Sequence, residues 1–295
     1  MARHRVAHQP KGFTMTEAQT VPARRIGLRL LVMLVVFTIV LVVSAAIDSA
    51  AAGNAVTALV FGALTAAGGL LLYRFLVGRL ERRPVDEVAA AGLAPGLLRG
   101  AGAGVVLFAV TIGIIAILGG YRIAGLGSLT ATIATFGTMV GAAVAEELLF
   151  RGALFRLVEE WLGTWAALAV SGVLFGALHL LNPGATLWGA IAIAAEAGLL
   201  LGAVYTATRS LWVPIGLHFG WNFAESGLFG TDVSGTTNTH GLVRGVAAGP
   251  DAISGGGFGP EGSVVAIVVG GVVAALLLRH AHRKGLIVRR GGAPR

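Results

Sequence analysis

Eight polar side chains of this sequence stand inside long apolar stretches, where a membrane would surround them. Ionisable groups within a bilayer cost about 2.5 to 3.5 kcal/mol each, so they usually face a partner or a water-filled cavity. Carboxylates and imidazoles can act there as general bases, and imidazoles and amides can donate hydrogen bonds to an oxyanion. The eight deep positions are Glu146, Glu147, Arg151, His179, Glu196, His218, Asn222 and Glu225.

The spacing of the first three positions separates the roles of the two adjacent acids. Glu147 and Arg151 stand four residues apart in the run "AEELLFR", so on a helix they share one face and can form an ion pair. Glu146 is rotated by about 100° from Glu147 and is free to point into a cavity. A carboxylate desolvated in such a cavity suits a general base that takes a proton from water. We therefore expect Glu147 to support Arg151 and Glu146 to carry out the chemistry.

Imidazole and amide groups follow on two later stretches. His179 lies in "FGALHLL", at an expected depth similar to that of Glu146 on the preceding helix. His218 and Asn222 stand four residues apart in "HFGWN", so both project from one face of a helix. The sequence thus predicts an acid, two imidazoles and an amide around one pocket.

Apolar stretches of membrane-spanning length must hold these residues in place. The chain has 295 residues, of which 56% are hydrophobic and 12% charged, and this composition excludes a water-soluble globular domain. A helix needs about 20 predominantly apolar residues to cross a hydrocarbon core. We predict an all-α, polytopic transmembrane helical bundle of about eight helices, with the active site among the fourth, fifth and seventh. The expected spans are 26–47, 55–77, 97–119, 132–158, 164–181, 186–206, 211–229 and 263–279.

The positive charges predict the topology of the bundle. The formal net charge is +8, and the Lys and Arg residues collect at the ends of apolar stretches, which argues against a nucleic-acid partner. By the positive-inside rule we expect a multi-pass protein of the cell membrane with both termini cytoplasmic. The expected parts are a disordered cytoplasmic N-terminus at 1–25, a single transmembrane domain at 26–279 with its catalytic core at about 130–230, and a basic cytoplasmic tail at 280–295.

Two further features lie outside the apolar stretches or at their ends. The connection 230–262 is rich in Gly, Ser and Thr, so we expect an irregular loop that serves as a lid or a docking surface. The sequence has no cysteine, which excludes disulfides and thiolate chemistry. The tryptophans expected to anchor the helices at the membrane interface are Trp161, Trp165, Trp188 and Trp212.

The order of the polar motifs resembles that of the CAAX protease and bacteriocin-processing family, abbreviated CPBP and also called the ABI family. Its members are intramembrane glutamic endopeptidases with the motifs EExxxR, FxxxH and HxxxN, and they include the CAAX prenyl endopeptidase. The corresponding runs are "EELLFR", "FGALH" and "HFGWN", and the stretch 206–222 is similar to the family's usual lead-in to its last motif. The resemblance extends over roughly residues 130 to 230.

This resemblance implies a role for each motif residue. The implied catalytic residues are Glu146, His179, His218 and Asn222, and the implied supporting residues are Glu147, Arg151 and Phe175. Glu146 and His179 would activate a water molecule, while His218 and Asn222 would stabilise the oxyanion. The implied chemistry is metal-independent and needs no cofactor.

Two other classes of function remain open from the residues alone. Glu146, His179 and His218 could form a zinc site with an open position, although the spans contain no HExxH, and resistance of the activity to chelators would discriminate. A non-catalytic scaffold or a proton-coupled transporter could instead use Glu146 and Glu147 as proton carriers. Glu196 and Glu225 have no partner in register, and we expect structural or solvated roles for them.

The expected partners are a peptide or protein substrate at the membrane and the lipid bilayer itself. Prenylated CAAX proteins give the family its name, and other members process or protect against peptides such as bacteriocins. The sequence selects neither a substrate nor an oligomeric state.

Overall fold

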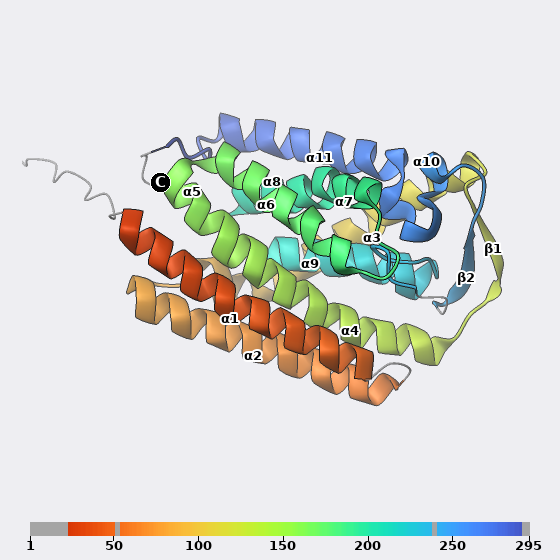
Figure 1. Ribbon diagram of the computed structural model, residues 1–295, viewed down its shortest axis with the longest axis horizontal. Helices are drawn as coiled ribbons and strands as arrows, with labels where there is room; N and C mark the ends of the chain where they lie inside the picture. Colours follow the sequence, from red (N-terminus) through yellow and green to blue (C-terminus); the bar gives the residue numbers. More distant parts are fainter. Residues whose placement is uncertain (1–22, 51–53, 238–240, 291–295) are drawn as a thin grey trace, which may run out of the picture.

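The structure is a computed structural model that describes residues 23–50, 54–237 and 241–290. It is a bundle of long helices packed side by side (Figure 1). Within the described residues, seven helices are long and apolar enough to cross a membrane. The all-α polytopic membrane bundle predicted from the sequence is thus confirmed. The segment 1–25, expected to be disordered, lies outside the described residues except for its last three, which begin the first helix.

The helices and strands follow the apolar stretches of the sequence. The α-helices are α1 (Ala23–Ala50), α2 (Ala55–Glu81), α3 (Leu93–Ile117), α4 (Leu129–Glu147), α5 (Arg156–Leu162), α6 (Thr164–Leu178), α7 (Leu187–Ile193), α8 (Leu199–Thr208), α9 (Trp212–Asn222), α10 (Asp251–Ser254) and α11 (Val264–Arg283). The π-helices are η3 (Leu148–Phe155), η5 (Ala194–Gly198) and η6 (Phe223–Leu228). The 3₁₀ turns are η1 (Asp86–Val88), η2 (Ala90–Gly92), η4 (His179–Leu181), η7 (Gly256–Phe258) and η8 (Pro260–Gly262), and the strands are β1 (Tyr121–Leu126) and β2 (Val243–Ala247).

The stretch expected to be the seventh span is shorter than its neighbours. It consists of α9, with 11 residues, and η6, with 6 residues, and it is not among the seven helices of spanning length. Eight of the residues of α9 are buried, because α3, α4 and α8 pack around it. Protein rather than lipid surrounds this helix, so its length is not tied to the thickness of the hydrocarbon core.

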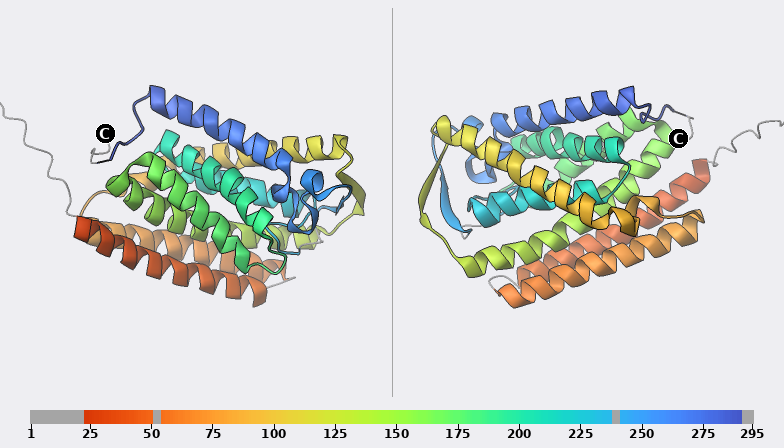
Figure 2. Two further views of the ribbon diagram at one scale, coloured as in Figure 1. Left: turned by 45° about the horizontal axis from the view of Figure 1, so that its top comes forward. Right: turned by 180° about the vertical axis from the view of Figure 1, so that it is seen from behind.

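Small residues let α9 approach its neighbour α3 closely, as Figure 2 shows from behind. A Cβ atom added to Gly104 of α3 would lie 2.3 Å from the carbonyl oxygen of Leu217. Likewise, a Cβ atom on Gly62 of α2 would lie 1.9 Å from the carbonyl oxygen of Gly137 of α4. Such contacts between small residues are the usual means of close helix packing in membranes. They fix α4 and α9, the two helices that carry the glutamates and the second histidine.

The end of the bundle opposite to the start of α1 and the end of α11 is closed in part by a pair of strands (Figure 1). Strands β1 and β2 pair antiparallel there, with a register shift between Ile123 and Gly125. The segment 230–262, expected to be an irregular loop, therefore contributes a strand as well as α10, η7 and η8. The hydroxyl of Tyr121 donates to the carbonyl oxygen of Phe229 over 2.8 Å, which ties the sheet to the end of η6.

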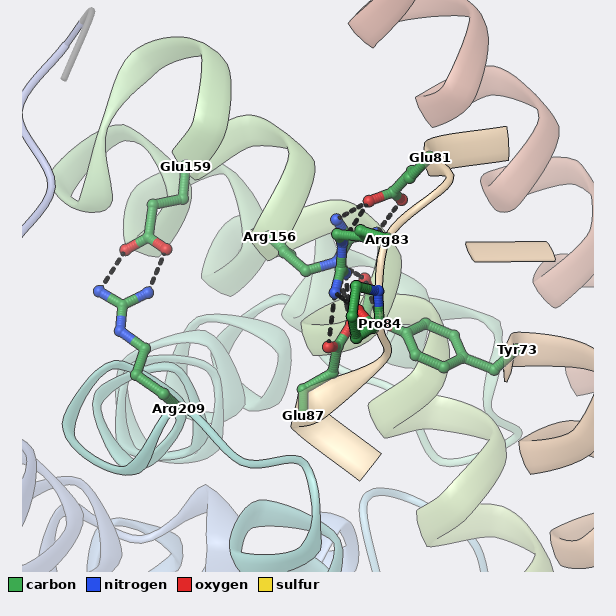
Figure 3. A network of polar contacts seen from close by, with 9 residues as sticks. Tyr73, Glu81, Arg83, Pro84, Glu87, Arg156, Glu159 and Arg209 are labelled. Atoms are coloured by element: carbon green, nitrogen blue, oxygen red, sulfur yellow. Dashed lines mark hydrogen bonds and ion pairs between the residues drawn. The ribbon is translucent and has the colours of Figure 1, made fainter. Parts of the chain in front are cut away.

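The opposite end is held together by a network of ion pairs (Figure 3). Arg156 of α5 donates to both carboxylate oxygens of Glu81, at 2.8 and 2.5 Å, while Arg83 donates to both oxygens of Glu87, at 2.9 and 2.6 Å. The hydroxyl of Tyr73 donates to Glu87 over 2.7 Å. Burial alone would raise the pKa of Glu87, but the hydrogen bonds from Arg83 and the positive charges of Arg156 and Arg83 together outweigh burial and lower that pKa. The network joins α2, η1 and α5.

Candidate functional site

The structure places the seven motif residues on three neighbouring helical segments. Glu146 and Glu147 end α4, Arg151 lies in η3, Phe175 ends the buried face of α6, His179 begins η4, and His218 and Asn222 lie on α9. Each of these segments departs from regular α-helix near the motif, because η3 and η6 are π-helical and η4 is a 3₁₀ turn. Short π-helical segments are frequent at functional sites.

Glu147 and Arg151 form the ion pair that their spacing predicts. The Arg151 guanidinium lies 2.8 Å from Oε1 of Glu147, and both side chains are fully buried. The same guanidinium donates to the carbonyl oxygens of Ala197 and Gly198, each over 3.2 Å, at the end of η5. Arg151 thus joins the α4–η3–α5 helix to the neighbouring helix while it compensates the charge of Glu147.

Glu147 also holds His218, a contact that the sequence reasoning did not anticipate. Nδ1 of His218 lies 2.9 Å from Oε1 of Glu147. Since an ionised carboxylate only accepts hydrogen bonds, Nδ1 carries the proton and Nε2 faces away from Glu147. That Nε2 lies 3.9 Å from Oε2 of Glu146, close enough for an ion pair and too far for a direct hydrogen bond. Glu147 and Glu146 therefore lie beside different nitrogens of the His218 imidazole, Nδ1 and Nε2 respectively.

The tautomer of His179 is fixed by its own helix. Nδ1 of His179 lies 2.7 Å from the carbonyl oxygen of Phe175, four residues earlier. A carbonyl oxygen can only accept a hydrogen bond, so this Nδ1 carries the proton. In the neutral ring, Nε2 is then left as a hydrogen-bond acceptor.

The aromatic ring of Phe175 lies at the centre of the site. The Arg151 guanidinium carbon stands 4.6 Å from the centre of this ring, a cation–π contact. The His179 ring centre lies 4.9 Å away and the His218 ring centre 5.9 Å away. Phe175 thus separates the two imidazoles and packs against both.

Both imidazoles line one small cavity of about 10 Å³. A cavity of this size holds about one water molecule. Its lining residues are Phe175, His179, Ile193, Glu196, Ala197, Leu200, Leu201, Leu217, His218, Trp221, Asn222, Ser234 and Glu261. Glu146, which we expected to point into a cavity, lies outside this lining with 16% of its side chain exposed. Its Oε2 is nevertheless buried and has no hydrogen-bond partner within the described residues.

Three further acids lie behind or within the cavity wall. Glu196 and Glu225 are buried rather than solvated, with 1% and 0% of their area exposed. Glu261, from η8, accepts from Nε1 of Trp221 over 3.0 Å and from the hydroxyl of Ser234 over 2.5 Å. Glu261 and Ser234 escaped the sequence reasoning because they belong to the segment 230–262. The signal that could have found Glu261 is its position three residues before an apolar helix.

The acids and histidines are not arranged as a set of metal ligands. Among the described residues, no group of three or more His, Cys, Asp or Glu side chains is placed so that it could hold a metal ion. The zinc alternative requires Glu146, His179 and His218 to converge on one point, and that convergence is missing from the described side chains.

Of the four tryptophans expected to anchor the helices at the membrane interface, one is buried. Trp161, Trp165 and Trp188 are exposed by 45%, 60% and 51%, as membrane-facing side chains should be. Trp212 is instead buried, and its Nε1 donates to the carbonyl oxygen of Ala89 over 2.9 Å. It fails as an interfacial anchor because it starts α9, the helix that other helices enclose.

Comparison with known proteins identifies the central part of the chain. Residues 127–224 match the family model described as Type II CAAX prenyl endopeptidase Rce1-like. No curated protein and no solved structure matches the chain. The matched stretch contains all seven motif residues. The protein therefore carries an Rce1-like domain of the CPBP family, which indicates a membrane protease of the CAAX type.

Proposed function

We propose that this protein is an intramembrane endopeptidase of the glutamate type that hydrolyses a peptide bond in a membrane-associated protein or peptide. The observation that carries the proposal is the arrangement of His179 and His218. Both rings have Nδ1 engaged, by a carbonyl oxygen and by a carboxylate, and both line one cavity with room for water. Glu146 supplies a carboxylate oxygen without a hydrogen-bond partner in the described residues, 3.9 Å from Nε2 of His218.

In the proposed reaction, Glu146 acts as the general base. It removes a proton from a water molecule while Nε2 of His179 accepts a hydrogen bond from the same water. The water oxygen attacks the carbonyl carbon of the scissile peptide bond, and a tetrahedral intermediate with an oxyanion forms. When the intermediate collapses, the C–N bond breaks and Glu146 returns the proton to the leaving amine, so the products are a carboxylic acid, which then loses its proton to the surrounding water, and an amine.

His218 and Asn222 stabilise the oxyanion in this proposal. The amide of Asn222 supplies one donor, and protonated His218 supplies a second through Nε2. Glu147 orients the imidazole of His218 through Nδ1, and Arg151 holds Glu147. Glu147, Arg151 and Phe175 therefore act as positioning residues.

The proposal extends to location and substrate class. We place the protein in the cell membrane with both termini cytoplasmic, because Lys and Arg residues gather at that end of the apolar stretches. The proposed substrate is a peptide or protein at the membrane, of the CAAX-like or the bacteriocin type. The reaction uses residues of the chain alone, without a metal ion or cofactor.

The test compares membrane and secreted peptides between cells that carry the intact protein and cells that carry Glu146→Gln. We expect a cleavage product to disappear, because the loss of a general base reduces the rate by about 10²- to 10⁴-fold. Glu160→Gln is a matched control on the same continuous helix, since Glu160 makes only a 3.9 Å contact with Arg29.

Purified protein then cleaves the identified peptide in the presence and absence of a strong chelator. Glu146→Gln should be inactive with unchanged thermal unfolding, and the chelator should have no effect on the intact protein. Full cleavage by Glu146→Gln would refute the proposed base, and loss of activity with the chelator would favour the zinc alternative.

A further inference from the structure

A large cavity lies at the end of the bundle where α6 begins and α11 ends, and it shares no lining residue with the small cavity of the histidines. Its volume is about 800 Å³, within the range of pockets that bind small molecules. It is bounded by the start of α6, the end of α8 and the segment after α11. The lining residues are Leu162, Gly163, Thr164, Trp165, Arg209, His282, Gly285, Leu286, Ile287, Val288, Arg289 and Arg290.

The lining of this cavity is strongly basic. Arg209 is paired with Glu159 over 2.5 Å (Figure 3), so its charge is compensated. Arg289 and Arg290 are exposed and have no ion-pair partner within the described residues. His282 adds a further group that can donate a hydrogen bond. The cavity thus offers two uncompensated guanidinium groups, the side chains that suit bidentate binding of a phosphate.

The segment that carries these arginines is held in place against α6. The amide of Thr164 donates to the carbonyl oxygen of Val288 over 3.0 Å, and the amide of Val288 donates to the hydroxyl of Thr164 over 2.9 Å. Gly163 has a φ of +88°, and a Cβ atom there would lie 2.9 Å from the carbonyl oxygen of Val288. Only glycine fits this turn, so the backbone next to Arg289 is a built wall of the cavity.

An apolar groove lies farther along the same face of α6. Trp165 lines the cavity, while Ala169, Val173 and Ala177 line the groove, and these positions repeat every four residues. The groove has a volume of about 430 Å³ and runs between α6 and the antiparallel α7–η5–α8 helix. Its lining residues are Leu168, Ala169, Gly172, Val173, Ala177, Leu180, Leu187, Ala190, Ile191, Ala194, Ala195 and Leu199.

We propose that the basic cavity and the apolar groove together bind one anionic phospholipid, with its phosphodiester at Arg289 and Arg290 and an acyl chain along α6. The charge of the cavity complements a phosphate, and the groove complements a hydrocarbon chain. The N-terminus of α6 also points its positive dipole end at the cavity. The site is separate from the proposed protease chemistry and does not depend on it.

The location of the site matches the position of a lipid in a bilayer. Trp165 and Trp161 are exposed by 60% and 45% at the same end, as expected where a helix leaves the hydrocarbon core. Val173 and Leu187 in the groove are exposed by 63% and 71%, so the groove opens to the lipid. A ligand with a charged head at the helix end and a chain in the groove therefore lies parallel to its neighbours in the membrane.

The experiment uses the full chain in nanodiscs of phosphatidylcholine. Binding of added phosphatidylglycerol is measured by native mass spectrometry, and inorganic phosphate is tested as a competitor. Arg289→Gln/Arg290→Gln removes the head-group contacts and should weaken binding about 10- to 100-fold. Ala169→Trp fills the groove and should weaken binding by a similar or smaller factor.

Two controls match these variants in charge and in bulk. Arg24→Gln/Arg25→Gln removes the same charge from exposed residues at the same end, and Ala67→Trp adds the same bulk on the lipid-facing side of α2. Both should bind phosphatidylglycerol within twofold of the unmodified chain, and all variants should keep its thermal unfolding. Equal weakening by the charge control would overturn the site, as would an absence of preference for phosphatidylglycerol. Displacement by millimolar phosphate, together with no effect of Ala169→Trp, would reduce it to a site for a free anion and also overturn the proposal.

Discussion

Two clusters of buried acids in this protein differ in whether their carboxylate oxygens accept hydrogen bonds from arginine side chains. In the network of Figure 3, both oxygens of Glu81 and of Glu87 accept hydrogen bonds from the guanidinium groups of Arg83 and Arg156. Around the histidines lie five acids, Glu146, Glu147, Glu196, Glu225 and Glu261, and Arg151 forms an ion pair with Glu147 among them. The oxygens left without a hydrogen-bond partner in the described part of the chain are Oε2 of Glu146, Oε2 of Glu147, Oε2 of Glu196 and both oxygens of Glu225.

The difference separates groups that hold the fold from groups that are available for chemistry. A buried acceptor without a donor costs about 1 to 3 kcal/mol, so a fold tolerates several of them only where another molecule can supply the donors. Water and a peptide amide are such donors. The unpaired cluster is therefore the one to which the proposed binding and catalysis are assigned, while the paired cluster contributes to stability. Four substitutions test this contrast.

Arg151→Met should have the largest effect. It leaves the carboxylate of Glu147 buried without its cation, which costs about 3 to 5 kcal/mol of unfolding free energy. Loss of the pair also frees His218, so cleavage by the surviving folded protein should be lost. Denaturant unfolding and peptide cleavage measure both effects. The double variant Arg151→Met/Glu147→Leu should regain much of the stability but no activity, and failure to regain stability would contradict the role of the charge.

Arg156→Met should cost less, although Arg156 makes more hydrogen bonds to carboxylates. Glu81 keeps a second guanidinium partner, since Nε of Arg83 lies 2.8 Å from its Oε2. We expect a loss of about 1 to 3 kcal/mol in unfolding free energy and a much smaller loss of activity than for Arg151→Met. Denaturant unfolding and peptide cleavage again measure the two effects. Equal losses of activity in Arg151→Met and Arg156→Met would contradict the difference between the two clusters.

Glu225→Gln should change stability in the opposite direction. The carboxyl group of Glu225 lies beside Glu261, and its two buried oxygens make no hydrogen bond of normal geometry within the described residues. An amide supplies a donor at the same position, so we expect the unfolding free energy to rise by about 1 kcal/mol. Glu159→Gln provides the matched control, because Glu159 is paired with Arg209 and its substitution should lower stability. A loss of stability in Glu225→Gln would show that the carboxyl group of Glu225 makes favourable hydrogen bonds in the folded protein, and would contradict the contrast.

The smallest expected effect is a dependence of the protein's stability on pH, which arises from Glu87 in the paired network. The pKa of Glu87 is lowered, so the folded protein releases this proton more readily than the unfolded chain does. The stability it contributes is therefore complete above the ordinary glutamate pKa of about 4.3 and is lost as the pH falls through the lower folded value. Thermal unfolding of the unmodified chain and of Glu87→Gln from pH 7 to pH 3 measures this. The difference between them should be constant at the upper end and shrink below about pH 4.

Much of the fold could be predicted because apolar length and helical period report it directly. Seven of the expected spans are helices of spanning length, and the pair of Glu147 and Arg151 follows from a spacing of four. The short helix α9 has the same apolar composition as its neighbours. Hydropathy could not show that protein rather than lipid surrounds it, and for the same reason Trp212 was expected at the interface.

The contacts between side chains of different helices could not be predicted from a single sequence. A wheel drawn through Glu146 and Glu147 assumes regular α-helix, but η3 begins directly after them and changes the register of the next turn. The hydrogen bond from His218 to Glu147 joins residues 71 positions apart, and no local pattern encodes it. Glu261 reaches the cavity from a Gly-rich segment, and its position shortly before an apolar helix does not by itself show which side chains it contacts.

The origin of the cavity walls has a consequence for protein engineering. Residues 127–224 carry every motif, yet Ser234 and Glu261 close the cavity from outside that stretch. If the matched stretch alone were transferred to another helical scaffold, the cavity beside the histidines would lack the part of its wall that Ser234 and Glu261 form. A chimera that retains this cavity needs the chain at least as far as η8, together with α11, which follows η8 and packs against it.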